Sequence, residues 1–269
     1  MLDQTRARDP AFPEPHFTAD TLLNGGVRLR QPAVGYRAAI DPVFLAAAVP
    51  AKPGERVLDA GCGAGAAFLC LARRVHGCTI AGVERDPAMA DLARFNATDN
   101  GFSNRVEIFT GNIAGHMPQL GSVSFDHVMM NPPYLDPART QGPVDAARAA
   151  AMVETNAISD WIAFAHRMLR SGGTLALIHR ADRLAAVRSA LSSRFGALME
   201  FPLLPMAGRD AKRVVVRAQR DAAPSVTQLP GLVLHRSDGR YTAEADEILR
   251  AGGALHFPDS VPLPASGAA

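Results

Sequence analysis

Apolar residues between positions 56 and 217 recur in two alternating patterns. Short apolar runs that end at glycine, proline or charged residues predict buried strands, and apolar residues three or four positions apart predict helices that pack on them. The predicted strands are 56–60, 79–84, 106–110, 125–130, 174–178, 199–204 and 213–217. The predicted helices are 39–49, one with Phe68, Leu71, Ala72 and Val75 on one face, 86–100 capped by Asp86, 159–169 capped by Ser159, and 182–195. Strands that alternate with helices are typical of an α/β protein with a parallel, doubly wound sheet, whose ligands bind at the carboxyl ends of the strands.

The last two predicted strands are joined by a segment around Gly208 that leaves no room for a helix. They are therefore expected to pair as an antiparallel hairpin. The expected sheet is mostly parallel and seven-stranded, and it ends in this C-terminal hairpin. Residues 1–16 and 258–269 are rich in proline and predict flexible tails, which leaves 17–257 as a single domain.

The composition is that of a folded globular protein, because 48% of the 269 residues are hydrophobic and 20% are charged. The N-terminal segment lacks the apolar core of a signal peptide, and no apolar run approaches the ~18 residues of a membrane span. The three cysteines contain no CxxC pair, and the eight histidines show no metal-ligand spacing. These features predict a soluble, cytoplasmic protein without a metal.

A glycine-rich loop follows the first predicted strand, with the sequence DAGCGAG at 59–65. Its spacing is G-x-G-x-G and position 66 is alanine, which differs from the dinucleotide-binding pattern G-x-G-x-x-G. Asp59 repels a pyrophosphate and favours a ligand with a positive amino group. Glu84 ends the second strand about 20 residues beyond the loop, where a carboxylate is expected to bind ribose hydroxyls.

This pattern resembles the cofactor pocket of class I S-adenosylmethionine methyltransferases, whose fold is a Rossmann-like α/β sheet. The resemblance implies that Asp59 lies near the methionine moiety and that Glu84 holds the ribose. It also implies that Asn112 accepts from the adenine amino group through its amide oxygen, at a position where the family often has aspartate. The implied cofactor-binding residues of this region are Asp59, Gly61, Gly63, Gly65, Glu84, Asn112 and Ile113.

The tetrapeptide Asn131-Pro132-Pro133-Tyr134 ends the fourth predicted strand. Its prolines stop the strand and leave a stiff turn whose carbonyls point outward. The Asn131 side chain and the Pro132 carbonyl offer two fixed acceptors for a planar NH2 group, and Tyr134 offers a flat face for stacking on a base. The lone pair of such an amine is delocalised, so the amine is a poor nucleophile. When the two acceptors bind both of its hydrogens, the lone pair is expected to point at a sulfonium methyl, and the rate comes from orientation and electrostatics.

The tetrapeptide resembles the signature of N-methyltransferases that act on adenine N6, guanine N2 or glutamine N5. Segments 35–37, 40–45, 211–216, 232–235 and 238–242 narrow this resemblance to one family. They are similar to the bacterial tRNA (adenine-N6)-methyltransferase family that acts on the anticodon loop of a valine tRNA. The similarity spans about residues 22 to 250.

The same resemblance implies that segment 17–50 closes over the cofactor, with Tyr36 and Asp41 as further, weaker contacts. For Asp41 an alternative stays open, which is N-capping of the helix predicted at 39–49.

We therefore expect an S-adenosylmethionine-dependent enzyme that methylates adenine N6 in tRNA, with Asn131, Pro132, Pro133 and Tyr134 at the catalytic site. Alternatives are a glutamine-N5 protein methyltransferase, a guanine-N2 RNA methyltransferase, and a non-catalytic nucleotide-binding or RNA-binding module. The segment before the first strand is too short and too broken by proline and glycine for the helical domain of release-factor methyltransferases. The chain after the core is too short for the target-recognition domain of DNA adenine methyltransferases.

Two basic segments are candidates for contact with RNA. The denser one holds Arg209, Lys212, Arg213, Arg217 and Arg220, offset by Asp210 and Asp221. On the predicted hairpin these side chains are suited to tRNA phosphates, and protection of an edge strand by charge is an equal alternative. The second candidate is 139–148, which follows the tetrapeptide.

Overall fold

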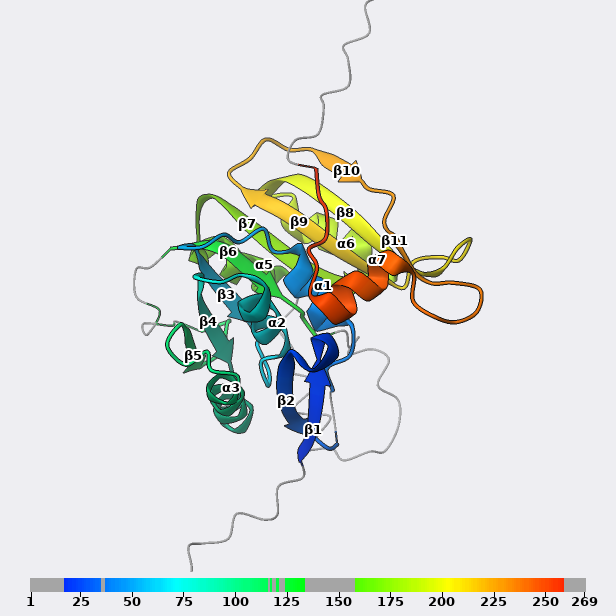
Figure 1. Ribbon diagram of the computed structural model, residues 1–269. Coiled ribbons are helices and arrows are strands. Elements are labelled where there is room, and N and C mark those ends of the chain that lie inside the picture. The colour runs from blue at the N-terminus through cyan, green and yellow to red at the C-terminus, as the bar shows by residue number, and fades with distance from the viewer. Residues whose placement is uncertain are drawn as a thin grey trace, which may run out of the picture.

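The computed structural model describes residues 17–34, 37–115, 117, 120, 124–133 and 158–258. Among these residues, nine strands form one twisted sheet in the order β10-β8-β9-β7-β6-β3-β4-β5, and β11 pairs with β8 beside β10 (Figure 1). The strands are β3 (Arg56–Ala60), β4 (Thr79–Glu84), β5 (Val106–Thr110), β6 (Phe125–Met130), β7 (Leu169–Arg180), β8 (Phe195–Met206), β9 (Arg213–Arg220), β10 (Val226–Gln228) and β11 (Leu232–His235).

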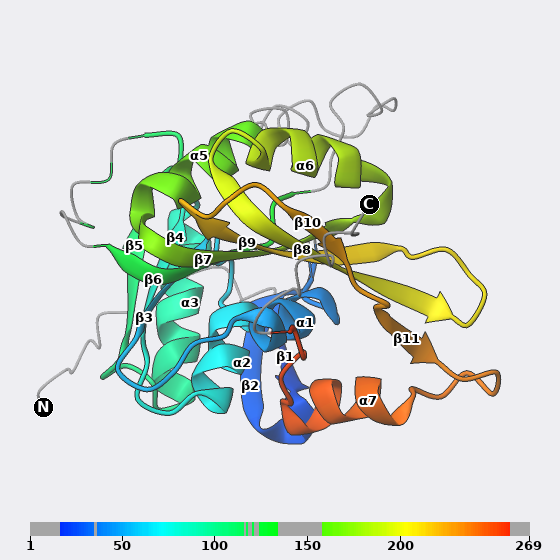
Figure 2. The same ribbon diagram turned by 90° about the horizontal axis from the view of Figure 1, so that it is seen from above.

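Helices cover both faces of the sheet. Figure 2 shows α5 and α6 on one face and α1, α2 and α3 on the other. Residues of β3 point alternately to the two layers, because Val57 packs with the α1 and α2 side and Leu58 with the α5 and α6 side. The helices are α1 (Asp41–Ala48), α2 (Ala66–Arg74), α3 (Pro87–Asp99), α5 (Ile158–Met168), α6 (Leu184–Leu191) and α7 (Ala243–Asp246), with short turns η1 (Leu23–Gly25), η4 (Ala181–Arg183) and η5 (Glu247–Ala251).

The sequence pattern predicted the parallel centre of the sheet correctly. Strands β3, β4, β5 and β6 have the predicted bounds, and β8 and β9 pair antiparallel as the predicted hairpin. The Asp86 carboxylate caps α3 by accepting from the Ala88 N–H at 2.9 Å. Local signals therefore sufficed where each element is bounded by its own glycine, proline or cap.

The sheet differs from the expectation in size, since it has nine strands instead of seven. The additional strands β10 and β11 both run parallel to β8. With three and four residues they are too short to show an alternating pattern. Because they cover β8, and because β9 lies between β7 and β8, β9 is not an edge strand and the edge-protection explanation for its charges is wrong.

Three predicted helix boundaries are also corrected. Helix α1 begins at Asp41, two residues later than expected. Helix α5 already includes Ile158, so Ser159 lies inside it and does not precede it. Helix α6 ends at Leu191, and Phe195 begins β8 instead, where its ring is buried. Burial of an apolar side chain in the sheet outweighs the helical spacing that includes it.

A separate two-stranded hairpin, β1 (Phe17–Leu22) and β2 (Val27–Pro32), precedes the main sheet. Asn96 of α3 and Asn100, the residue that caps the C-terminus of α3, bind the backbone of β2. Asn96 accepts from the Arg30 N–H at 2.9 Å and donates to the Arg30 carbonyl at 2.8 Å. Asn100 does the same for Arg28, at 2.8 and 2.7 Å. The two side chains thus replace a third strand and hold the hairpin on α3.

In the described part of the chain, no helix has the length and apolarity needed to span a bilayer. The predicted tails, apart from Pro258, lie outside the described residues, as does the basic segment 139–148.

Candidate active site

A cavity of about 60 Å³ lies at the carboxyl ends of β3 and β6. Asp59 and Gly61 reach it from β3, Asn131 from β6, and Met89 from α3. The glycine loop and the start of α2 add Cys62, Ala64, Ala66 and Ala67, and the N-terminal segment adds Gln31, Pro32, Ala38 and Pro42. The carboxyl ends of neighbouring parallel strands meet at one edge of the sheet, so residues far apart in sequence share this cavity. We call it the carboxyl-edge cavity.

The three glycines of the loop have different functions, although all three have positive φ angles of 71°, 54° and 100°. A Cβ atom on Gly61 would overlap the ring of Trp161, and one on Gly65 would overlap the ring of Phe68. A Cβ atom on Gly63 would meet only the Met89 Cε atom at 3.9 Å. The first and third glycines therefore accommodate the protein's own aromatic rings, and Gly63 is the glycine of the loop whose backbone no ring covers.

Glu84 holds the glycine loop in place. Its Oε2 atom accepts from the Gly63 N–H at 2.9 Å, and its Oε1 atom accepts from the Asp86 N–H at 2.9 Å. A carboxylate has about four lone-pair sites, so both oxygens can still accept from hydroxyl groups. The side chain predicted to hold a ribose is thus pre-oriented at the end of β4.

Asp59 contributes a carboxyl group to the cavity lining and is buried, with 2% of its surface exposed. Burial raises the pKa of Asp59 to about 7, the Phe68 N–H opposes this shift, and the Glu84 charge adds to it. Within the described residues, its Oδ2 atom has no hydrogen-bond partner. A buried carboxylate with an unsatisfied oxygen in a cavity fits a ligand that brings a positive amino group.

Asn131 and Pro132 follow directly on β6. Met130 pairs with Ala60 of β3 and Leu177 of β7, which places the next residues beside the glycine loop. Asn131 is half-buried and lines the cavity, while Pro132 is buried and Pro133 exposed. Tyr134 of the tetrapeptide and Tyr36 of the N-terminal segment lie outside the described residues.

Asn112 and Ile113 follow β5, at the far side of β4 from the glycine loop. The Asn112 Oδ1 atom accepts from the Ala114 N–H at 3.0 Å, so part of its acceptor capacity is used within its own turn. Ile113 is buried under α5, and its carbonyl accepts from Arg167 at 3.3 Å. Their predicted contact with adenine stays a prediction.

Asp41 does not cap α1, because Ile40 occupies the N-cap position and no side chain caps there. The N-capping alternative is therefore wrong. Asp41 is buried, with 8% of its surface exposed, and its carboxylate forms an ion pair with Arg213 of β9 at 2.8 Å. Asp41 thus connects α1 to β9 next to Pro42, which lines the carboxyl-edge cavity.

Two residues of the site carry no motif and were missed in the sequence. Gln31 is 5% exposed, donates to Asp20 at 3.0 Å and accepts from the Ala38 N–H at 2.8 Å. Asn96 also donates to the Ala64 carbonyl of the glycine loop at 2.8 Å. The sequence did contain a signal for the role of Asn96, because Asn96 and Asn100 lie four positions apart on the apolar face of a predicted helix. A buried side-chain amide requires fixed hydrogen-bond partners.

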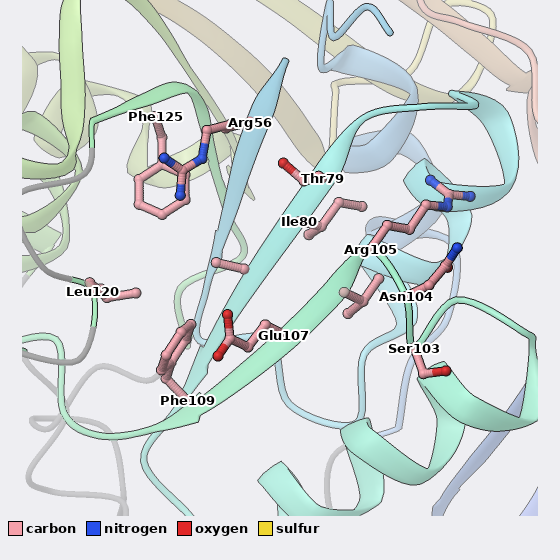
Figure 3. Close-up of a pocket in the computed structure, with 12 residues that line it drawn as sticks. Arg56, Thr79, Ile80, Ser103, Asn104, Arg105, Glu107, Phe109, Leu120 and Phe125 are labelled. Atoms are coloured by element: carbon pink, nitrogen blue, oxygen red, sulfur yellow. The ribbon is translucent and has the colours of Figure 1, made fainter. Parts of the chain in front are cut away.

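A larger cavity of about 480 Å³ lies at the opposite edge of the sheet, at the amino ends of β3, β4 and β5. Figure 3 shows Arg56 above Phe125, and Glu107 beside Phe109 on the floor formed by β4 and β5. Arg105 and Asn104 stand at the opposite side of this amino-edge cavity. Among the described residues, no three His, Cys, Asp or Glu side chains gather as metal ligands.

Comparison with known proteins agrees with this geometry. Residues 31–201 match the family described as methyltransferase small domain. A protein of Porphyromonas gingivalis named tRNA1(Val) (adenine(37)-N6)-methyltransferase is 31% identical over 229 residues, which cover 80% of this chain and 87% of the relative. A protein of the same name from Dickeya chrysanthemi is 28% identical and covers 85% and 94% of the two chains.

Among solved structures, an Agrobacterium tumefaciens protein described as a predicted O-methyltransferase has a TM-score of 0.69 and 29% identity, and the match covers 82% of this chain and 100% of that one. A Thermotoga maritima O-methyltransferase has a TM-score of 0.52 at 19% identity, which concerns the fold alone. Fold and cavity thus define a class I methyltransferase that uses S-adenosylmethionine. The chain belongs to the methyltransferase small domain family.

Proposed function

We propose that the protein methylates the exocyclic N6 amine of an adenine in the anticodon loop of a tRNA, in the cytoplasm. The observation that carries the proposal is the position of Asn131 and Pro132, at the end of β6 and next to the cavity that contains Asp59. The curated relatives are named for this reaction on tRNA1(Val), which supports RNA as the substrate.

The residues around the carboxyl-edge cavity are suited to S-adenosylmethionine. Asp59 would accept from the amino group of its methionine moiety, and Glu84 would accept from its ribose hydroxyls. Gly63 would let the cofactor approach the loop backbone. Asn112 and Ile113 would contact the adenine, with Tyr36 and Asp41 as weaker contacts. When bound, the cofactor supplies an electrophilic methyl group on a positively charged sulfur.

Asn131 and the Pro132 carbonyl would accept the two hydrogens of the target amine and orient its lone pair. Tyr134 would stack on the base. Because the amine loses its proton only after it has become cationic, no strong base is needed before the attack. The rate would therefore come from orientation and electrostatic placement. This chemistry suits an NH2 group better than a hydroxyl group, which lacks a second hydrogen for the second acceptor.

A folded RNA loop suits a small enzyme of this kind. A base in such a loop is already partly unstacked, so extruding it costs less than extruding a base from a duplex. Glutamine N5 in a protein and guanine N2 in RNA offer the same planar amine and are the competing substrates. The proposed function and these competitors differ in the product, which makes the substrate measurable.

The decisive experiment transfers a labelled methyl group from S-adenosylmethionine to total RNA and total protein from a strain that lacks this gene. We expect label in the tRNA fraction and N6-methyladenosine after digestion to nucleosides. Label in protein alone would reject the RNA substrate, and label in N2-methylguanosine would reject the target base. The Asn131→Ala variant serves as the control for background transfer.

A further inference from the structure

Two loops at the carboxyl edge carry exposed basic side chains that the site described above does not use. One is the turn between β8 and β9, with Arg209 and Lys212, and the other follows β11, with Arg236 and Arg240. Figures 1 and 2 both show the yellow turn and the orange loop projecting side by side. We call these four side chains the loop-tip surface.

The two loops are fixed to each other by contacts at their bases. His235 pairs with Met206 in the parallel ladder of β11 and β8, and its Nδ1 atom lies 3.0 Å from the Pro205 carbonyl oxygen. The His235 ring stacks on Tyr241 at a centroid distance of 4.7 Å, which closes the second loop. The Arg236 N–H donates to the Arg240 carbonyl at 2.8 Å across that loop. The surface is therefore ordered before any partner binds.

The charges of the loop-tip surface leave an excess of positive charge. Asp238 pairs with Arg236 at 2.9 Å and also accepts from the Arg240 N–H at 3.0 Å, so it is held inside its loop. Asp210 is the only other acidic residue among 207–212 and 236–240. Four basic groups thus face solvent with two acidic ones between them, on loops that protrude from the molecule.

The other arginines of the same hairpin make contacts within the protein. Arg213 is paired with Asp41, and Arg217 lies over the Phe257 ring at 4.6 Å. Arg220 donates to the carbonyls of His166 and Leu169. These three side chains stabilise the fold at β9, so the basic run seen in the sequence divides into an internal part and an exposed tip.

The exposed tip lies at the same edge of the sheet as the active site. The Lys212 carbonyl accepts from the Ala181 N–H at 3.2 Å, and Arg180 at the end of β7 pairs with Arg213 in the ladder. Strand β7 is the neighbour of β6, and Asn131 follows β6 at the same edge of the sheet. A polyanion on the loop tips would thus extend towards the cavity over β9 and β7.

We propose that the loop-tip surface binds the backbone phosphates of the RNA whose base enters the carboxyl-edge cavity. The proposal rests on the proposed function, because it requires an RNA substrate. Arginine and lysine side chains on ordered loops hold phosphates in a fixed register without reading the sequence. Arg209, Lys212, Arg236 and Arg240 therefore position the RNA, while Asn131 and its neighbours act on the base.

The experiment compares two double variants that remove the same charge from opposite edges of the sheet. The test variant is Arg209→Ala with Lys212→Ala. The control is Arg194→Ala with Lys52→Ala, whose exposed side chains lie just before β8 and β3 at the amino edge. The affinity for an unmodified tRNA transcript is measured between 50 and 200 mM salt, together with methyl transfer at saturating tRNA and the dissociation constant of the cofactor.

We expect the plot of log affinity against log salt to be less steep for the test variant, by about 1.8. This is the contribution of the counterions released at two phosphate contacts. Over this salt range the wild type should then lose about ten-fold more affinity than the test variant. The transfer rate at saturating tRNA and the cofactor affinity should stay unchanged, and the control variant should keep the wild-type slope.

An unchanged slope in the test variant, or an equal change of slope in the control variant, would contradict the proposal that the loop-tip surface binds RNA. The outcome is separate from that of the proposed function. If the wild type methylates tRNA while the test variant keeps its slope, the loop-tip surface is wrong and the function stands. If the wild type binds no tRNA, or an acidic protein competes for the same side chains and alone accepts methyl groups, both are wrong.

Discussion

The two cavities at opposite edges of the sheet differ in a way that volume alone would misjudge. The amino-edge cavity, at about 480 Å³, is the larger, and the carboxyl-edge cavity has about 60 Å³. Around the larger one, two of the lining residues are bound by the fold. The Arg56 N–H donates to Asp126 at 2.9 Å, and Arg105 donates to the Val75 carbonyl at 3.1 Å.

Around the smaller cavity, binding capacity is left over. Among the described residues no group binds the buried Oδ2 atom of Asp59, and a Cβ atom on Gly63 would meet only the Met89 Cε atom at 3.9 Å. Asn131 lines the same cavity, and the prolines that follow it end strand β6 there. A ligand site is thus marked by polar groups that the fold orients but does not satisfy, and the size of the void is a weaker guide.

The largest expected effect is on kcat, and it is tested by replacing one asparagine in each cavity. Asn131→Ala should lower kcat by about 10²- to 10³-fold, the loss typical of one acceptor or donor that orients a transition state. The cofactor dissociation constant should change less than two-fold, because the proposed partner of Asn131 is the target amine and not the cofactor. The measurements are steady-state transfer into tRNA and calorimetric titration of S-adenosylhomocysteine.

The matched control is Asn104→Ala in the amino-edge cavity, which should leave both quantities at wild-type values. Equal loss of kcat in the two variants would mean that the tetrapeptide has no special role. Loss of cofactor binding alone in Asn131→Ala would assign that side chain to the cofactor instead of the amine.

The second effect is a pH dependence of cofactor binding through Asp59. Its pKa is raised to about 7, so below pH 7 the carboxyl group is protonated and must release its proton to pair with the amino group of the cofactor. Affinity should therefore fall by up to about ten-fold for each pH unit below 7 and level off above it. Calorimetric titrations from pH 5.5 to 8.5 measure this.

Asp59→Asn keeps the shape of the side chain and removes the titration. This variant should bind the cofactor more weakly at pH 8 and show a flat profile between pH 6 and 8. If the cofactor affinity of the wild type is also constant between pH 6 and 8, the assignment of Asp59 to the cofactor site is wrong.

The third effect concerns the docking of the N-terminal hairpin beside the carboxyl-edge cavity. Asn96→Ala leaves the Arg30 N–H and carbonyl and the Ala64 carbonyl without their buried partner. We expect a loss of about 1–3 kcal/mol in the free energy of unfolding. The cofactor should also bind more weakly, since Gln31 and Ala38 lose their support.

Asn100→Ala is the comparison variant, because Asn100 is only half-buried and its partners on Arg28 can turn to water. Thermal unfolding should place its melting temperature between those of the wild type and Asn96→Ala. The reverse order would contradict the docking function assigned to Asn96.

The smallest expected effect is that of Glu107→Gln on the floor of the amino-edge cavity. Cofactor affinity and transfer rate should each stay within two-fold of the wild type, as for other exposed substitutions away from a site. A ten-fold loss of either quantity would show that the larger cavity takes part in the reaction.

Sequence signals located the parts of the site that are local in the chain. The glycine loop, Asp59, Glu84 and the tetrapeptide each stand at the end of a strand whose own pattern marks it. Long-range contacts left no such signal. The pairing of β10 and β11 with β8, the amides of Asn96 on β2, and the Trp161 ring against Gly61 depend on segments that meet only in the folded chain.

The basic run of the hairpin illustrates the same limit. In the sequence, Arg209 and Arg213 are equivalent members of one cluster. In the fold, Arg209 is exposed at a turn while Arg213 is paired with Asp41. Composition therefore predicts a charged surface, and only the pairing of β9 with its neighbours decides which charges a partner can reach.

The most direct measurement is a crystal structure of the protein with bound S-adenosylhomocysteine. We expect the amino group of the ligand within hydrogen-bond distance of Asp59, its ribose hydroxyls at Glu84, and its sulfur directed towards Asn131. Ligand density in the amino-edge cavity, or density at the carboxyl edge in which Asp59 contacts no cationic group, would contradict the assignment of the site.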